Sequence, residues 1–318
     1  MHVLEVRDLV VSYKISDKEL RAVDKVSLDI AKSEAVGLCG ESGSGKSTLA
    51  LSLMRLLPSN AKIIGGEIVL NGENILSKNE KEMEKIRGKV CSIVFQGALN
   101  ALNPVYRISD QITEAILQHK KLSKRDAEKQ VNELSLLVNL DPQRLRSYPH
   151  ELSGGMKQRV LIATALSCEP DLVIMDEPVT ALDVMTQSRI LEEIKKLKNE
   201  LHQSILFISH DINTIGEFCD RIFIMYAGRI LEHADTKTIF NDPRQPYTCG
   251  LLKSLFTDTK GTLYSIPGEP PNAMNLPSGC PFHPRCGYKL PICEKELPEM
   301  VETEKDHFVR CHVFGKPT

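Results

Sequence analysis

The stretch from Ala35 to Ser47 reads AVGLCGESGSGKS and decides the fold. Its first part, Ala35–Cys39, is an uninterrupted apolar run that is typical of a strand buried on both faces. The remainder fits the pattern G-x-x-x-x-G-K-[ST], in which glycines let successive backbone N–H groups point at phosphate oxygens. A strand, a phosphate loop and a helix are therefore predicted in this order. The predicted nucleotide-binding residues are Ser42, Gly43, Ser44, Gly45, Lys46, Ser47 and Thr48.

Two side chains of the loop carry its chemistry. Lys46 offers a cation to the β- and γ-phosphates, and the hydroxyl of Ser47 is suited to Mg²⁺. The helix that opens at the loop adds a dipole that favours a bound anion. The sequence therefore predicts a nucleotide site that also holds magnesium.

Strands and helices alternate on both sides of this loop. The predicted strands are Val3–Val6, Val23–Ile30, Ala35–Cys39, Glu67–Leu70, Cys91–Phe95, Leu172–Met175 and Ile205–Ile208, the first two antiparallel. The predicted helices are Thr48–Leu57, Ile108–Leu140 and Ile190–Leu201. This alternation indicates an α/β fold.

Composition excludes several classes of protein. The 318 residues are 42% hydrophobic and 26% charged, which is typical of a globular protein, and the net charge of −2 predicts no nucleic-acid partner. A membrane-spanning helix needs about 20 consecutive apolar residues, and the apolar runs here are strand-sized. The N-terminus has no basic and apolar regions of a signal peptide. We therefore expect a cytosolic chain that reaches a membrane only through partners.

The composition changes near residue 240. Prolines become frequent between Asp242 and Pro298, and a high proline density disfavours long helices and strands. We therefore predict a main domain over residues 1–240 and a loop-rich C-terminal extension over residues 241–318.

Two acidic residues follow the predicted strand at Leu172–Met175. Asp176, at the carboxyl end of the strand, is placed to hold Mg²⁺, and Glu177 to act as general base on an attacking water. The alternative is that these carboxylates cap the N-terminus of a helix.

Residues 152–156 read LSGGM and resemble LSGGQ, the signature of ATP-binding cassette (ABC) proteins, with Met156 at the Gln position. The phosphate loop, the signature, Asp176-Glu177-Pro178, Ala181-Leu182-Asp183 and Ser209-His210-Asp211 occur in the order of that family. The chain is therefore identified as a member of the ABC family. The resemblance implies a P-loop NTPase cassette with an α-helical subdomain inserted at about residues 98–160.

The resemblance also implies roles for single residues. Tyr13 is similar to the aromatic residue that stacks on adenine, and an ordinary surface tyrosine is the alternative. Gln96 resembles the glutamine that contacts Mg²⁺ and water, although Gly97-Ala98 replaces the more frequent acidic residue after it. His210 resembles the histidine that contacts the γ-phosphate. The resemblance also implies that Ser153, Gly154 and Gly155 face the nucleotide held by the opposite subunit of a dimer. Asp183 resembles the aspartate that communicates across this dimer.

Several segments resemble the oligopeptide/dipeptide importers of this family. They are Ala101-Leu102-Asn103-Pro104 and the tail segments 241–248, 266–271 and 279–286. The resemblance implies an ATP-hydrolysing subunit that works as a dimeric ATP sandwich and energises import of di- or oligopeptides. Nickel or small-solute import is one alternative, a soluble ABC ATPase another, and a metal-based sensor a third.

The importer resemblance also implies partners and a location. The implied partners are a second ATPase subunit, commonly a paralogue, two transmembrane permease subunits and, indirectly, an extracytoplasmic peptide-binding protein. The implied location is the cytoplasmic face of the cell membrane, with peripheral attachment.

Four of the nine cysteines lie in the last 39 residues, and they are Cys280, Cys286, Cys293 and Cys311. Three interpretations are open: free thiols, a zinc site assisted by His283, His307 or His312, and an iron–sulfur cluster. The spacing lacks the C-x₂₋₄-C pairs typical of zinc, and some peptide importers resemble this pattern and carry a cluster. We therefore expect a [4Fe–4S] cluster, with Zn²⁺ as the alternative.

Overall fold

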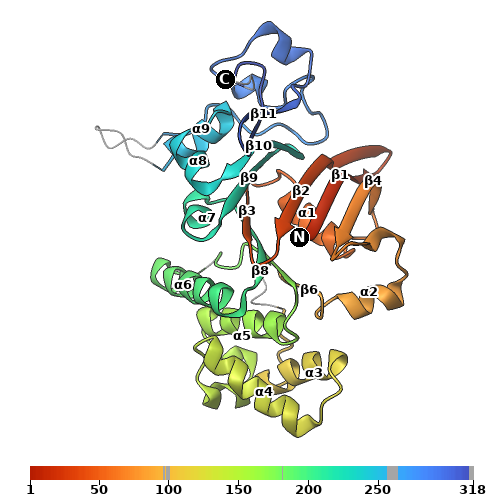
Figure 1. The fold of residues 1–318 in the computed structure, drawn as a ribbon, viewed down its shortest axis with the longest axis vertical. Helices are drawn as coiled ribbons and strands as arrows, with labels where there is room; N and C mark the ends of the chain where they lie inside the picture. Colours follow the sequence, from red (N-terminus) through yellow and green to blue (C-terminus); the bar gives the residue numbers. More distant parts are fainter. Residues whose placement is uncertain (96, 98–100, 181, 256–263, 315–318) are drawn as a thin grey trace. The chain divides into compact units, whose positions relative to one another are not determined.

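The computed structural model describes residues 1–95, 97, 101–180, 182–255 and 264–314 (Figure 1). The chain divides into two compact units. The first unit consists of Met1–Leu4, Ile30–Ala35 and Leu70–Phe207, and the second of Glu5–Asp29, Val36–Val69 and Ile208–Thr318.

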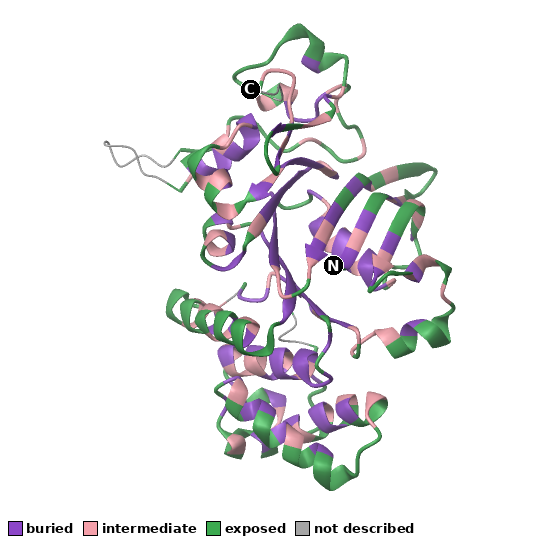
Figure 2. Cartoon of the chain, in the orientation of Figure 1, coloured by how far each residue is buried: buried purple, intermediate pink, exposed green. Residues whose placement is uncertain are grey.

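The second unit contains the strand that leads into the phosphate loop. This strand, β3 (Ala35–Cys39), runs parallel to β9 (Arg221–Tyr226). Beyond β9, the sheet continues antiparallel through β10 (Arg229–Asp235), β12 (His307–Arg310) and β11 (Met300–Glu304). Every residue of β3 is buried, and so is nearly all of β9 (Figure 2). This burial on both faces explains the continuous apolar runs in the sequence.

The rest of the second unit consists of a second sheet, short helices and 3₁₀ turns. Its strands are β2 (Lys18–Ala31), β1 (His2–Ile15) and β4 (Ala61–Leu70), adjacent in that order and, except for end residues, part of this unit. The two-residue strand β5 (Glu73–Asn74) belongs to the first unit. The helices are α1 (Lys46–Leu53), α7 (Ile212–Phe218), α8 (Thr236–Asn241) and α9 (Pro246–Lys253), and the 3₁₀ turns are η5 (His283–Arg285) and η6 (Pro291–Glu294).

The first unit contains parallel strands and most of the longer helices. Strand β6 (Cys91–Val94) pairs parallel with β7 (Leu172–Asp176), and β8 (Ser204–Ser209) lies on the other side of β7. The helices are α2 (Glu80–Ile86), α3 (Ile108–His119), α4 (Lys124–Leu137), α5 (Gly154–Leu166) and α6 (Val184–Leu201). The 3₁₀ turns are η1 (Ile75–Ser77), η3 (Pro142–Arg146) and η4 (Pro149–Glu151). Helices α3, α4 and α5 contact one another.

The predicted α/β fold is confirmed, and the helix ends differ from the prediction for local reasons. The predicted helix at 108–140 is interrupted at residues 120–123, because Ser123 accepts a hydrogen bond from the backbone N–H of Asp126 and starts α4. Helix α1 ends at Leu53, before Arg55 enters the left-handed region at φ 50°. Helix α6 begins earlier than predicted, at Val184, because Asp183 caps it.

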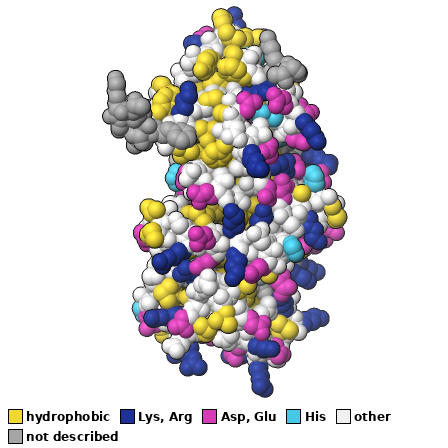
Figure 3. All heavy atoms as spheres, turned by 60° about the vertical axis from the view of Figure 1, so that its left-hand side comes forward, with side chains coloured by type: hydrophobic (Ala, Val, Ile, Leu, Met, Phe, Trp, Pro, Cys, Tyr) yellow, Lys and Arg dark blue, Asp and Glu magenta, His cyan; other side chains and the backbone are white. Residues whose placement is uncertain are grey.

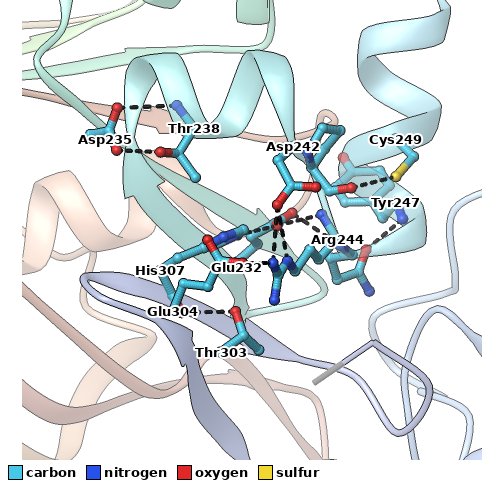
Figure 4. Close-up of polar contacts among 12 residues, drawn as sticks. Glu232, Asp235, Thr238, Asp242, Arg244, Tyr247, Cys249, Thr303, Glu304 and His307 are labelled. Atoms are coloured by element: carbon cyan, nitrogen blue, oxygen red, sulfur yellow. Dashed lines mark hydrogen bonds and ion pairs between the residues drawn. The ribbon is translucent and has the colours of Figure 1, made fainter. Parts of the chain in front are cut away.

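The C-terminal extension is less irregular than its prolines suggest. After Pro298, residues 300–310 form the β11–β12 hairpin on the edge of β10. At this edge, His307 Nε2 lies 2.8 Å from Glu232 Oε1, and both side chains are almost completely buried (Figure 4). Glu232 also accepts hydrogen bonds from the backbone N–H groups of Arg244 and Gln245. A buried carboxylate therefore joins the hairpin to the start of α9.

The distribution of charged side chains and the length of the apolar helices indicate which surroundings the described part of the chain fits. Basic and acidic side chains are interspersed on the face drawn in Figure 3, consistent with 40 Lys and Arg against 42 Asp and Glu. Within the described ranges, no helix combines the length and the apolar character needed to cross a membrane.

Candidate nucleotide-binding site

The phosphate loop folds around the side chain of Lys46. Lys46 is only 5% exposed, and its Nζ donates hydrogen bonds to the carbonyls of Gly40 at 2.6 Å and Glu41 at 2.9 Å. Gly45 has φ 105°, and a Cβ there would lie 2.2 Å from the carbonyl oxygen of Ala22. Only glycine fits this position, because both the backbone conformation and the close approach exclude a side chain.

The open side of the loop fits a phosphate group. Ser42 and Gly43 are exposed, and Ser47 and Thr48 are half-buried in the first turn of α1. The N-terminus of a helix presents free backbone N–H groups to an anion. The donors needed for a polyphosphate, and a hydroxyl suited to Mg²⁺, are therefore together in one segment.

Of the residues predicted from the family resemblance, Tyr13 lies close to this segment and the backbone of His210 lies beside the strand that enters it. The hydroxyl of Tyr13 is 3.2 Å from Thr48 Oγ1. The thiol of Cys39, the last residue of β3, donates to the backbone carbonyl of His210 at 4.0 Å, and the His210 side chain is exposed. The fold therefore brings the carbonyl of His210 beside the strand that enters the loop, across 171 positions of sequence.

The predicted acidic pair lies at the carboxyl end of β7 in the first unit. Asp176 is 4% exposed. Glu177 has φ 47°, which is rare for a residue with a side chain, and it accepts a hydrogen bond from Thr180 Oγ1 at 2.9 Å. Helix α6, which follows, is capped by Asp183. The alternative interpretation of this acidic pair as a helix cap is therefore wrong.

The signature residues and Asp183 lie at the starts of two neighbouring helices. Ser153 caps α5 by accepting from the backbone N–H of Met156 at 3.4 Å, and Gly154 and Gly155 form the first turn. Asp183 accepts from the N–H and the hydroxyl of Thr186 at 3.0 and 2.7 Å, which lowers the pKa of its carboxyl. A Cβ on Gly155 would lie 2.7 Å from Thr186 Cγ2. The first turn of α5 therefore packs directly against that of α6.

The residues that fix these two helices together were not among those predicted from the sequence. Thr186 contacts both the capping aspartate and the glycine, and one ion pair, between Arg159 and Glu193, links the helices further along. Gly155 and Arg159 are four residues apart on α5 and therefore share one helix face. This spacing was the sequence pattern that could have indicated the face of α5 that packs on α6. Gln96, Ala98 and Ala181 lie outside the described residues.

The four tail cysteines do not form the expected metal centre. Among the described residues, which include all four, no group of three or more His, Cys, Asp or Glu side chains is placed to hold a metal ion. The [4Fe–4S] prediction for Cys280, Cys286, Cys293 and Cys311 is therefore wrong, and so is the zinc alternative. The names of the relatives described below also mention no cluster.

Each of the three histidines near the tail cysteines contacts a backbone carbonyl or a carboxylate. Burial is the main cause that raises the pKa of the Cys280 thiol to about 11. The nearby histidines make other contacts: His283 with the carbonyl of Cys280, His307 with Glu232, and His312 with the carbonyl of Glu296. The clustering of these cysteines has no further explanation in the structure.

Comparison with known proteins identifies the family. The ABC transporter family matches residues 23–180, and the family "Oligopeptide/dipeptide transporter, C-terminal region" matches residues 231–293. The oligopeptide transport ATP-binding protein OppD of Escherichia coli K12 is 42% identical over 93% of this chain and 88% of that protein. The dipeptide transport ATP-binding protein DppD of Bacillus subtilis 168 is 42% identical over 97% of this chain and 94% of that protein. The chain belongs to the ABC transporter family. Within it, the chain belongs with the oligopeptide/dipeptide ATP-binding subunits.

Solved structures of ABC cassettes agree with this assignment. The chain resembles the dimeric MJ0796 cassette with a TM-score of 0.66 and 28% identity, over 73% of this chain and 98% of that one. The same cassette is also known in a post-hydrolysis state with ADP and Pi. CbiO1 of Clostridium perfringens gives the same TM-score and identity over 76% and 91% of the two chains. The predicted P-loop cassette and its ATPase character are thereby confirmed.

Proposed function

We propose that this ABC ATPase energises the import of di- or oligopeptides through a membrane permease. The observation that carries the substrate class is the match of residues 231–293 to the C-terminal region of oligopeptide/dipeptide transporters. Relatives named for oligopeptide and dipeptide transport, aligned over more than 90% of the chain, support the same class.

In this proposal the second unit binds the nucleotide. Backbone N–H groups of residues 42–48 and the ammonium of Lys46 bind the β- and γ-phosphates, and Tyr13 stacks on adenine. The position of Tyr13 beside Thr48 supports this role, because it places an aromatic ring at the end of the loop. His210 contacts the γ-phosphate.

Hydrolysis depends on the acidic end of β7. Glu177 accepts a proton from water as the water oxygen bonds to the γ-phosphorus and the bond from phosphorus to the ADP oxygen breaks. Magnesium, when bound, neutralises phosphate charge, and Ser47, Asp176 and Gln96 are its proposed ligands. The left-handed backbone of Glu177 supports a functional role, since such strain concentrates at functional sites.

A dimer follows from the second anion site at the start of α5. Ser153, Gly154 and Gly155 form a helix N-terminus, which offers backbone N–H groups to an anion. The phosphate loop of the same chain already supplies the donors for its own nucleotide, so this second set suits a nucleotide bound elsewhere. We propose that the signature binds the γ-phosphate of a nucleotide held by the opposite subunit, with Asp183 communicating between subunits. The dimeric form of the MJ0796 cassette supports this arrangement.

The remaining partners follow from the transport role. They are a second ATPase subunit, which is a paralogue in this proposal, two transmembrane permeases and, indirectly, an extracytoplasmic peptide-binding protein. The chain would attach peripherally at the cytoplasmic face of the membrane through the permeases.

The test of the substrate class is uptake by the assembled transporter in membrane vesicles. Labelled dipeptide, labelled pentapeptide and radioactive nickel are supplied in separate experiments. ATP is supplied on the side of the vesicle membrane where the ATPase subunits lie. We expect ATP-dependent peptide uptake that is lost in Lys46→Ala and kept in Lys121→Ala, which removes an exposed lysine. Nickel uptake without peptide uptake would contradict the proposed substrate.

A further inference from the structure

The C-terminal extension holds the second residue of the phosphate loop. Arg285 Nη1 donates to Glu41 Oε2 at 2.7 Å, and Arg285 Nη2 donates to Glu41 Oε1 at 3.1 Å. The two residues are 244 positions apart in the sequence. The Arg285 side chain is 6% exposed and that of Glu41 is 24% exposed, so the pair is largely shielded from water.

Arg285 is itself fixed by its surroundings. Its Nη1 also donates to Tyr226 Oη at 3.2 Å, and its Nε donates to the carbonyl of Pro267 at 2.9 Å. The guanidinium lies 5.9 Å from the ring centroids of Tyr226 and Phe282. Since a planar guanidinium held at several points keeps one orientation, Arg285 offers Glu41 a preorganised partner.

The backbone of Glu41 is held by the same part of the fold. Its N–H donates to Tyr247 Oη at 2.8 Å, and its carbonyl accepts from Lys46 Nζ at 2.9 Å. Tyr247 packs against Tyr226 with ring centroids 4.6 Å apart. The backbone N–H of Tyr247 donates to the side chain of Gln245, near the buried Glu232 (Figure 4). Glu41 is therefore connected through α9 to the sheet edge.

The charge of Glu41 makes its partner important. A carboxylate within a loop that binds phosphates repels the ligand, because like charges in a partly desolvated site interact strongly. The ion pair neutralises this carboxylate and fixes its direction. Without Arg285, the loop would carry an unpaired negative charge beside the nucleotide.

We propose that Arg285 is a positioning residue for the phosphate loop, through which the C-terminal extension sets the affinity for ATP. The inference rests on the ATP binding proposed above. It assigns to the extension a function in the nucleotide cycle, in addition to any contact with transport partners.

The test compares Arg285→Met, Glu41→Gln and the double variant in the full-length chain. The readouts are the Kd for a fluorescent ATP analogue and, in the assembled transporter, KM for ATP and kcat. We expect Arg285→Met to raise Kd and KM about tenfold with kcat changed less than about twofold. Glu41→Gln removes the repelling charge, and we expect a change below about threefold. The double variant should match Glu41→Gln.

A matched control separates positioning from general stabilisation of the extension. Arg244, 14% exposed in its side chain, forms ion pairs with Asp242 and Glu304 in the same extension. Arg244→Met should leave the Kd for the ATP analogue within about twofold of wild type. The Arg285→Met defect should also shrink at high salt, because salt screens the unpaired carboxylate.

The outcomes distinguish this inference from the proposed function. Wild-type Kd in Arg285→Met, a double variant as weak as Arg285→Met, or an equal defect in Arg244→Met would each overturn the positioning role while leaving ATP binding intact. A wild-type chain that binds no ATP would overturn both. If Arg285→Met does not fold, Arg285→Lys replaces it, with a smaller rise in Kd expected, because lysine keeps the charge and loses the two-point contact.

Discussion

Arg159 of α5 forms a two-point ion pair with Glu193 of α6, with nitrogen–oxygen distances of 2.9 and 2.7 Å. The side chains are 17% and 14% exposed. One turn before Arg159, Gly155 packs on Thr186. The helix that begins at the signature and the helix capped by Asp183 are therefore joined at two points. A change at one helix start is expected to be transmitted to the other.

The first prediction concerns this ion pair. Arg159→Met leaves the partly buried carboxylate of Glu193 without its partner, and we expect a loss of about 1–3 kcal/mol in the free energy of unfolding. Glu193→Gln should cost a similar amount, and the double variant should cost less than the sum. The measurement is denaturant unfolding followed by circular dichroism.

A solvent-exposed pair on the same helix provides the control. Lys196 and Glu200 lie 3.8 Å apart with exposures of 71% and 49%. Lys196→Met should change stability by less than about 0.5 kcal/mol. Equal losses of unfolding free energy in Lys196→Met and Arg159→Met would show that the Arg159–Glu193 pair contributes no more to stability than an exposed pair.

The second prediction concerns the close approach of Gly155 to Thr186. In Gly155→Ala the new methyl group would meet Thr186 Cγ2 at 2.7 Å, so the Thr186 side chain or the helices must shift. We expect a loss of about 1–3 kcal/mol in stability and a clear fall in ATP hydrolysis. Thr186→Ser removes that methyl and keeps the hydroxyl that bonds Asp183. The double variant should therefore regain activity, and a double variant as slow as Gly155→Ala would refute the steric explanation.

The third prediction concerns pH. His233 stacks between Phe223 and Phe308, with both centroid distances 4.5 Å. Burial, and then the charge of Arg221, lower its pKa to about 4, against 6.5 for an unperturbed histidine. Between these values the unfolded chain binds a proton that the folded chain does not bind. Stability is therefore lost as pH falls below about 6.5.

The measurement for His233 is the free energy of unfolding at pH 7 and pH 5. Wild type should lose about 1–2 kcal/mol more than His233→Phe over this interval, because phenylalanine keeps the stack and has no proton to bind. Parallel pH profiles for the two proteins would assign the acid sensitivity to other groups.

Short-range patterns in the sequence predicted much of the fold. The order β3, phosphate loop and α1 was predictable because the motif, the apolar run and the helix start are contiguous. The strands β7 and β8 were predictable because each contains a short, continuous run of apolar residues. Helix ends were less accurate, because single caps such as Ser123 and Asp183 decide them.

Contacts between distant segments were not predictable from one sequence. The pairing of Glu41 with Arg285 depends on tertiary folding across 244 positions, and neither residue type indicates its partner. The tail cysteines show the opposite error, since clustering in the sequence suggested a ligand set. In the fold, no group of three or more His, Cys, Asp or Glu side chains among the described residues is placed to hold a metal ion.

The most direct test of Glu177 as the general base of ATP hydrolysis is ATP turnover and ATP binding in Glu177→Gln, measured on the full-length chain and on the assembled transporter. We expect unchanged affinity for ATP and a fall in turnover by about 10²–10⁴-fold, the usual contribution of a general base. Glu192→Gln, which changes an exposed glutamate of α6, should behave as wild type. Near-normal turnover in Glu177→Gln would contradict the proposed mechanism.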